Sequence, residues 1–248
     1  MELIARNKCP ISQEQELELL YSFNDFPIFM GCVDTPANQD LKTNMNWYIG
    51  RCNGIIQLNP LIPLEILYGK SHGSGTVGKL WDKHHKEFAD FVSKYKLKRL
   101  IEIGAGHGKM IENYLDIIPD STWSVVEPNP KIIKDKRITV IKGLFDENFD
   151  LDNDIEGVVH SHVIEHLYYP IELFKNIFNK TNEKIIHLFS IPNLEVMLER
   201  NYTNALNFEH TLFLNESCIE FLLKQTGFHI IEKKYFMEDH SIFYATKK

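Results

Sequence analysis

The stretch that decides the fold is Leu100–Met110, LIEIGAGHGKM. An apolar run ends in Gly104, Gly106 and Gly108, and an amphipathic segment follows. Glycine at the end of a strand permits a positive φ and lets a ligand approach the backbone closely, while the next helix begins with unpaired N–H groups. The stretch therefore predicts a nucleotide-binding turn between a strand and a helix.

The spacing of these glycines narrows the choice of ligand. A dinucleotide fingerprint, G-x-G-x-x-G, needs its third glycine at position 109, where this chain has Lys109. The compact G-x-G-x-G preceded by Glu102 resembles the first motif of class I methyltransferases, which hold a sulfonium amino acid. The resemblance implies a Rossmann-like α/β domain with S-adenosyl-L-methionine as cofactor, and it makes Glu102, the three glycines and the intervening Ala105 cofactor-binding candidates.

An acidic residue stands where a ribose contact is expected. The segment SVVEPNP ends the next predicted strand, and its Glu127 lies about 20 residues beyond the glycines, where a carboxylate can accept both ribose hydroxyls. We expect Glu127 and the adjacent Pro128 at the cofactor. The alternative for Glu127 is a solvated acid at a strand end.

A third station follows in the same order along the chain. In IKGLFDE, Leu144 and Phe145 are candidates to flank an adenine ring. Burial of Phe145 in the core is an equally good interpretation.

The fourth station is the segment VVHSHVIEHLYYP after the fourth predicted strand. In the class I family a segment of this type lines the methyl-donor cleft, which implies that Ser161 and His162 lie near the cofactor. Glu165 and His166 lie just beyond and are candidate substrate contacts. For His166, a hydrogen-bonded structural role is the simpler alternative.

The pattern around the glycine turn predicts a βαβ series that begins near Ala89 and ends in an antiparallel hairpin. NESCIEFLLKQTG, from Asn215 to Gly227, predicts a helix with an Asn N-cap and a Gly stop. Ser12–Ser22 predicts an amphipathic helix, and Phe23–Gly78 shows little periodicity. We therefore expect a small irregular N-terminal lobe over residues 1–80 and a mostly parallel α/β sheet over residues 81–248. The predicted strands are Arg99–Ile103, Trp123–Val126, Ile138–Ile141, Gly157–His160, Lys184–Phe189, Ile230–Phe236 and Ile242–Ala245.

Composition limits the partners. The 248 residues carry a net charge of -7 and a pI near 5.9, which offers no positive field for nucleic acid. The most apolar early stretch, Ile55–Tyr68, is interrupted by polar residues and prolines, so no membrane association is expected. The chain starts without a secretory pattern, and its four cysteines are too scattered for a disulfide framework. We expect a cytoplasmic protein with reduced thiols.

The N-terminal lobe resembles the sugar C-methyltransferases of deoxysugar pathways, through Cys9, Cys52–Leu58, Tyr68 and Ser71–His85. Members of that family carry a zinc module made of two C-x-x-C pairs. In this chain Ser12 and Ile55 stand where the second cysteine of each pair belongs, so a tetrahedral thiolate site cannot be assembled from them. We expect no structural zinc, and no metal in the site.

The family's signature Tyr-x-Glu-His appears as Asn207-Phe208-Glu209-His210. The resemblance and the titration range of imidazole make His210 the candidate base, with Glu209 orienting the ring or binding the acceptor. Asn207, in place of tyrosine, is a candidate substrate contact and leaves the choice between oxygen and carbon attack open. A structural role for His210, tying a loop to the core, is the alternative.

These observations predict methyl transfer to a small polar acceptor at O or C. The resemblance implies a nucleotide-linked sugar, or a related precursor of a surface polysaccharide such as a capsule. A catalytically inactive nucleotide-binding regulator or assembly protein is the second hypothesis, because the cysteine pairs are broken and Asn207 replaces tyrosine. A nicotinamide-dependent oxidoreductase is disfavoured by Lys109 and by the terminal hairpin.

Overall fold

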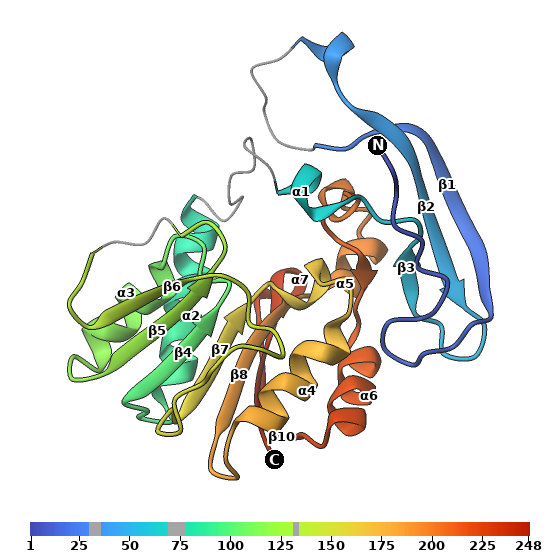
Figure 1. The fold of residues 1–248 in the computed structure, drawn as a ribbon. Helices are drawn as coiled ribbons and strands as arrows, with labels where there is room; N and C mark the ends of the chain where they lie inside the picture. Colours follow the sequence, from blue (N-terminus) through green and yellow to red (C-terminus); the bar gives the residue numbers. More distant parts are fainter. Residues whose placement is uncertain (30–35, 69–77, 131–133) are drawn as a thin grey trace. The chain divides into compact units, whose positions relative to one another are not determined.

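The computed structural model describes residues 1–29, 36–68, 78–130 and 134–248 (Figure 1). Cys32, part of Ser71–His85 and part of the predicted irregular lobe lie outside these ranges. The chain forms two compact units. Unit 1 comprises Met1–Gly75, Ile164–Pro170 and Leu194–Cys218, and unit 2 comprises Thr76–Val163, Ile171–Asn193 and Ile219–Lys248.

Unit 2 is built on a seven-stranded sheet of order β10-β11-β8-β7-β4-β5-β6. The five strands from β8 to β6 pair in parallel, whereas β11 pairs antiparallel with both β8 and β10. This is the mostly parallel α/β sheet with a terminal hairpin that the sequence predicts. The strands are β4 (Arg99–Ile103), β5 (Thr122–Glu127), β6 (Ile138–Lys142), β7 (Gly157–Ser161), β8 (Ile186–Pro192), β10 (His229–Phe236) and β11 (Ser241–Lys247).

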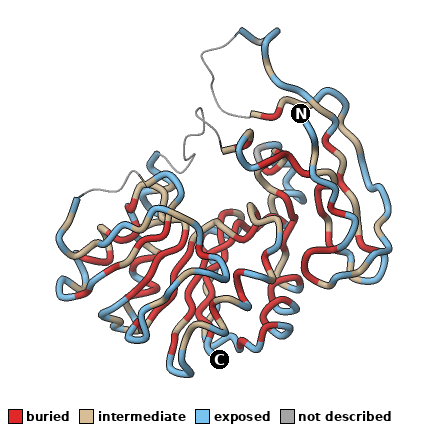
Figure 2. The backbone as a smooth tube through the Cα atoms, in the orientation of Figure 1, coloured by how far each residue is buried: buried red, intermediate tan, exposed pale blue. Residues whose placement is uncertain are grey.

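Helices cover both faces of this sheet because its central strands are apolar on both sides. On one face, α2 (Lys79–Ser93) and α3 (Lys109–Ile117) pack over Val159 and Leu188. On the other, Phe174 of α4 (Pro170–Lys180) contacts His160 and Phe189, the next residues along the same strands. Figure 2 shows the resulting core as buried backbone along the central strands. The helix predicted between Asn215 and Gly227 is confirmed as α6 (Glu216–Thr226).

Unit 1 contains an antiparallel sheet of order β1-β2-β3-β9, not the irregular lobe expected from the sequence. Its helical segments are short. The strands are β1 (Leu17–Pro27), β2 (Lys42–Gly50), β3 (Ile56–Leu58) and β9 (Leu212–Phe213), and the helices are α1 (Leu64–Leu67), α5 (Leu194–Glu199) and the 3₁₀ turns η1 (Ala37–Gln39), η2 (Ile164–His166) and η3 (Thr203–Ala205).

The helix predicted over Ser12–Ser22 is wrong. Leu17–Pro27 is a strand paired with β2, and its register shifts between Leu19 and Tyr21 and again between Phe23 and Phe26. Each shift breaks the alternation of exposed and buried side chains by which a strand is recognised in a sequence. The hydrogen bonds of the β1–β2 ladder come from tertiary pairing, which overrides local helical periodicity.

The two units also divide the chain differently from a boundary at residue 80. Strand β9 pairs with β3, so a late segment completes the first sheet. The buried guanidinium of Arg6 links β3 to the segment before β9 by donating to the carbonyl oxygens of Leu58 and Thr211. Burial lowers the pKa of Arg6 to about 10. Such long-range pairing is invisible to a reading of local composition.

No helix in the described ranges combines the length and apolarity that a membrane crossing requires.

Candidate functional site

The glycine turn lies in unit 2 between β4 and α3. Gly104, Gly106 and Gly108 have φ values of 74°, 55° and 71°, in the left-handed region that favours glycine. A Cβ on Gly104 would come within 2.8 Å of the Val163 side chain. The turn therefore requires glycine for its conformation, and at Gly104 also for space. Ala105 within the turn is half-buried.

Glu127 ends β5 beside this turn. One carboxylate oxygen accepts a hydrogen bond from the backbone N–H of Asn129 at 3.1 Å, and the other accepts from Gly106 at 3.4 Å. The parallel pairing of β4 and β5 brings the two strand ends together. A carboxylate offers about four lone-pair sites, so acceptor capacity remains for a ligand.

Glu102 lies in β4, two residues before Gly104, and is 2% exposed. Its Oε2 atom has no hydrogen-bond partner among the described residues. Burial, and then the negative charge of Glu127, raise the pKa of Glu102 to about 8. A buried acceptor without a partner beside a glycine turn fits a site that receives a polar ligand.

Glu102 gives a testable pH dependence. Its pKa rises from 4.5 to about 8 on folding, so folding is favoured by proton binding at low pH, and this contribution is lost as pH rises through that window. The loss is on the order of 1.4 kcal/mol per pH unit across the window. In cofactor-free protein, Glu102→Gln should therefore melt progressively higher than the unsubstituted chain as pH rises. If the melting temperatures of the two proteins instead differ by a constant amount from about pH 5 to pH 9, the raised pKa of Glu102 is contradicted.

Ser161 and His162 stand where β7 ends. The Ser161 and Ser190 hydroxyl oxygens are 2.7 Å apart, and the backbone N–H of His162 donates to the Ser190 carbonyl at 3.0 Å. His162 has a φ of 52°, unusual for a non-glycine residue. Its Nε2 lies 2.9 Å from the Ser241 hydroxyl at the start of β11.

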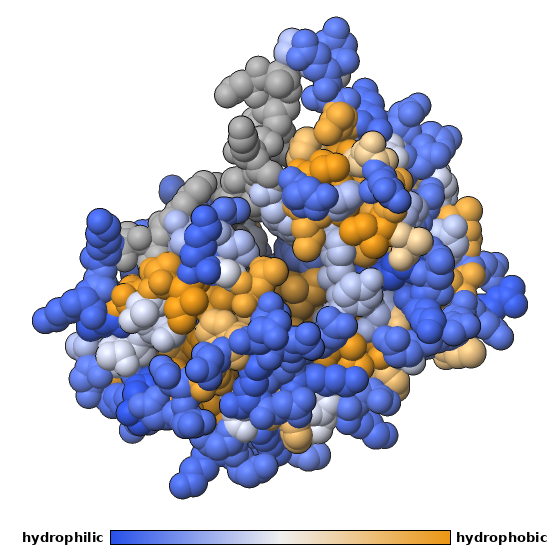
Figure 3. Space-filling model, viewed as in Figure 1, coloured by the Kyte–Doolittle hydropathy of each residue, from blue (hydrophilic) through white to orange (hydrophobic). Residues whose placement is uncertain are grey.

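The adenine candidates separate in the structure. Phe145 is buried, with its ring 5.0 Å from that of Phe149, whereas Leu144 is 62% exposed and Pro128 is exposed. Figure 3 shows apolar surface over β6, where Val140 is also exposed. Core packing therefore accounts for Phe145, and Leu144 is the residue of the pair whose apolar side chain is exposed.

Unit 1 brings together the other predicted residues, Glu165, His166 and His210, with a ligand-type atom of each within 4.8 Å of the others. The His166 and His210 ring centres are 5.1 Å apart, and His166 Nε2 lies 3.8 Å from the buried Glu165 carboxylate. Tyr68 joins the group through its hydroxyl, 3.3 Å from His166 Nδ1. Sequence reasoning did not place Tyr68 in the site, because α1 is brought here only by tertiary contacts.

The backbone around His210 fixes its ring. Asn207 Oδ1 accepts the backbone N–H of His210 at 2.8 Å, and His210 Nδ1 lies 3.1 Å from the Ala205 carbonyl oxygen. A carbonyl only accepts, so this contact assigns the proton to Nδ1 and leaves Nε2 as the basic nitrogen. Asn207 thus has a local structural role that the tyrosine of the signature would not perform. Glu209 is half-buried, and after burial its charge is the next cause that raises the pKa of Tyr68.

A family model described as "Methyltransferase domain" matches residues 77–233, a span longer than half of the chain. The chain belongs to the methyltransferase-domain family. This confirms the expected class of domain, and S-adenosyl-L-methionine is the cofactor that goes with it. The narrower likeness to sugar C-methyltransferases is not part of this match.

Solved methyltransferase structures share the fold at low sequence identity. Mitomycin 7-O-methyltransferase MmcR matches with a TM-score of 0.55 and 13% identity, covering 66% of this chain and 54% of its own. For RosA of Streptomyces davawensis, an N,N-8-amino-8-demethyl-D-riboflavin dimethyltransferase, the TM-score is 0.54 and the identity 17%, over 66% of this chain and 55% of its own. The plantazolicin methyltransferase BpumL, solved with SAH, gives 0.52 and 12%, over 68% and 84%.

The match thus spans about half the length of the first two of these proteins. A search of curated protein sequences found no match.

The cysteines carry a second prediction. Cys9 is buried and Cys52 exposed, and neither belongs to the two three-residue groups of potential metal ligands in the described ranges. Replacing both with serine should leave the metal content of the dialysed full chain unchanged, as measured by elemental analysis. A stoichiometric loss of zinc in the double variant would show that these thiolates are ligands.

Proposed function

We propose that this protein transfers a methyl group from S-adenosyl-L-methionine to a small polar acceptor, a nucleotide-linked sugar or related precursor of a surface polysaccharide. One observation supports S-adenosyl-L-methionine as the methyl donor. The glycine turn, Glu127 and the unpartnered Glu102 oxygen lie together where β4 and β5 end, in a domain that matches the methyltransferase family. The acceptor half rests on the sequence resemblance of Tyr68 and of the segment Asn207–His210.

The residues present fit the cofactor. The positive-φ glycines leave room for a ligand against the backbone, the Glu127 carboxylate suits a ribose diol, and Glu102 offers a buried acceptor. Ser161 and His162 follow the neighbouring strand, and Leu144 offers apolar surface. When bound, the cofactor supplies a methyl group already activated by its sulfonium, so the protein must supply alignment, dryness and a base.

We assign the base to His210. Its Nδ1 is held by the Ala205 carbonyl, so Nε2 takes the acceptor's proton, from a hydroxyl or from an acidic carbon. Glu165, His166 and Tyr68 form the polar surroundings in which the acceptor's oxygens are held. Glu165 and His166 follow His162 after only three and four residues of chain.

Other observations support a small acceptor. The proteins named above act on mitomycin, a riboflavin derivative and plantazolicin, according to their names. A net charge of -7 disfavours a nucleic acid. The proposal includes the cytoplasmic location expected from the sequence, because all described cysteines are free thiols.

A labelled-methyl assay tests the proposal. The protein is incubated with methyl-labelled S-adenosyl-L-methionine and nucleotide sugars, each paired with its free sugar and its free nucleotide. We expect label in one or more nucleotide sugars and in neither paired control, and NMR of the product then separates oxygen from carbon methylation. Transfer to the free sugar alone would overturn the nucleotide-linked acceptor. Intact cofactor binding without transfer to any compound would favour an inactive nucleotide-binding regulator.

A further inference from the structure

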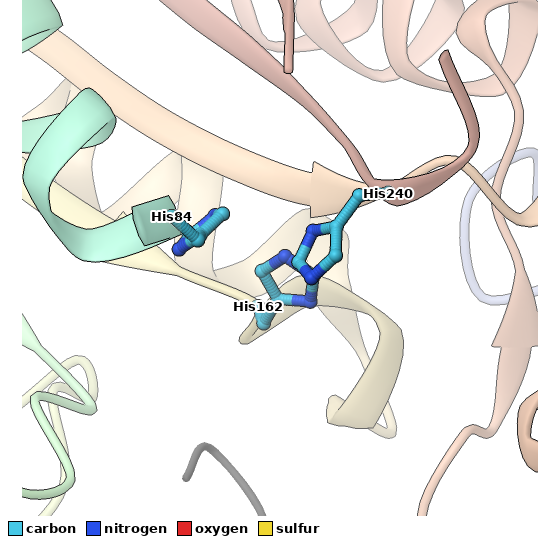
Figure 4. Close-up of side chains that lie close together, drawn as sticks. All are labelled: His84, His162 and His240. Carbon is cyan, nitrogen blue, oxygen red and sulfur yellow. The ribbon is translucent and has the colours of Figure 1, made fainter. Parts of the chain in front are cut away.

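Three histidines from separate elements of unit 2 gather into one cluster (Figure 4). His84 lies in α2, His162 follows β7, and His240 ends α7 (Met237–His240) just before β11. One ring nitrogen of each lies within 4.8 Å of those of the other two. We propose that His84, His162 and His240 form a binding site for a divalent transition-metal ion of the Zn²⁺ class.

The ring spacing suits one shared ion. With Zn–N bonds of about 2.0–2.1 Å, an imidazole centre lies about 3.2 Å from the metal, so tetrahedral ligands have ring centres about 5.2 Å apart. The ring centres of His84 are 5.1 Å from His162 and 5.3 Å from His240, and the third separation is 5.9 Å. Small side-chain rotations therefore bring three nitrogens onto one ion.

The two ring nitrogens of His84 are buried without a hydrogen-bond partner among the described residues. The side chain as a whole is completely buried. Other buried histidines of this sheet do find polar partners, since the His160 and His187 Nε2 atoms are 2.9 Å apart and His187 Nδ1 lies 3.3 Å from the Thr246 hydroxyl. Buried polar groups in native proteins are normally satisfied, and a metal ion would satisfy His84.

The surroundings favour neutral, oriented imidazoles. Burial lowers the pKa of both His84 and His240, which keeps their rings in the form that donates a lone pair to a metal. The Ser241 hydroxyl lies 2.9 Å from His162 Nε2 and 2.6 Å from His240 Nδ1, and it holds these two rings in place. Trp81 packs against all three rings at centre distances of 4.9–5.2 Å.

Three protein ligands leave a tetrahedral ion with one open position. Sites of this composition take a water or an exogenous oxygen as the fourth ligand, unlike closed four-ligand structural sites. In this buried cluster the expected fourth ligand is a water molecule. The proposed site differs from the expectation of a metal-free protein drawn from the sequence. The cysteines of the broken pairs are not among its ligands.

Cobalt is the probe, because Co²⁺ takes Zn²⁺ sites and its visible d–d absorption reports tetrahedral coordination. Full-length protein stripped with a chelator is titrated with Co²⁺, and Zn²⁺ displacement follows. We expect one ion per chain with a tetrahedral spectrum. His84→Phe keeps an aromatic ring against Phe88 and Phe243 while removing both nitrogens, and should weaken binding by at least about 100-fold, beyond the usual effect of losing an outer-shell partner.

Two controls make the result decisive. His229→Phe removes an exposed histidine of β10, and His210→Ala removes a ligand from the other three-residue group; both should retain the Co²⁺ spectrum. His240→Asn serves if His84→Phe does not fold, as judged by near-UV circular dichroism. Absence of a tetrahedral spectrum, equal affinity in the cluster variant, or loss of the spectrum in His210→Ala would each overturn the proposal. The readout needs no methyl donor, so its failure is separate from failure of the proposed methyl transfer.

Discussion

His210→Ala is expected to lower the turnover rate by about 10²- to 10⁴-fold, the usual effect of losing a positioned general base. Affinity for S-adenosylhomocysteine should stay nearly unchanged, because the base acts on the acceptor. The structural reason is the contact between Nδ1 and the Ala205 carbonyl, which leaves Nε2 to accept a proton. Steady-state kinetics with the acceptor identified by the labelled-methyl assay, and calorimetry with S-adenosylhomocysteine, measure the two effects separately.

The matched control is His229→Ala, which removes an exposed histidine from β10 and should leave turnover unaltered. A lower melting temperature with unchanged specific activity would identify His210 as a structural residue. The catalytic role would then move to Glu165 or His166.

Glu127→Ala should weaken S-adenosylhomocysteine binding by about 1.5–3 kcal/mol, or roughly 10- to 150-fold in the dissociation constant. The carboxylate already accepts from Gly106 and Asn129, which fixes its position at the end of β5. Its loss removes a charge-assisted acceptor for the ribose, and it also releases the glycine turn from this contact. Calorimetric titration measures the change.

Glu127→Gln is the companion variant, because it keeps the side-chain length and one acceptor oxygen while removing the charge. Its affinity should fall between those of the unsubstituted protein and Glu127→Ala. The pKa of Glu102 should fall in both variants, since the charge of Glu127 contributes to raising it. An unchanged dissociation constant in Glu127→Ala would remove Glu127 from the cofactor site.

The architecture of unit 2 is predictable because its signals are local. A parallel strand buried on both faces appears in the sequence as a continuous apolar run. Glycines directly after such a run mark a turn that needs positive φ angles. Parallel pairing then brings Glu127 beside Gly106 without any further information. The resemblance to class I methyltransferases depended on these same residues, and the family match agrees with it.

Unit 1 was poorly predicted because long-range pairing determines its structure. The register shifts in β1 hide the alternation of a strand, and β9 joins β3 from far along the chain. Tyr68 meets His166 for the same reason. The histidine cluster of unit 2 has no sequence signature either, since α2, the end of β7 and the start of β11 become neighbours only when the sheet has formed.

A calorimetric comparison of two ligands shows which cofactor the glycine turn of unit 2 binds. Full-length protein is titrated with S-adenosylhomocysteine and, separately, with NAD⁺. The glycine spacing that ends in Gly108 and Lys109, together with Glu127, predicts one S-adenosylhomocysteine per chain and no measurable binding of NAD⁺. Binding of NAD⁺ in preference to S-adenosylhomocysteine, or failure of the folded protein to bind S-adenosylhomocysteine at all, would show that S-adenosyl-L-methionine is not its cofactor.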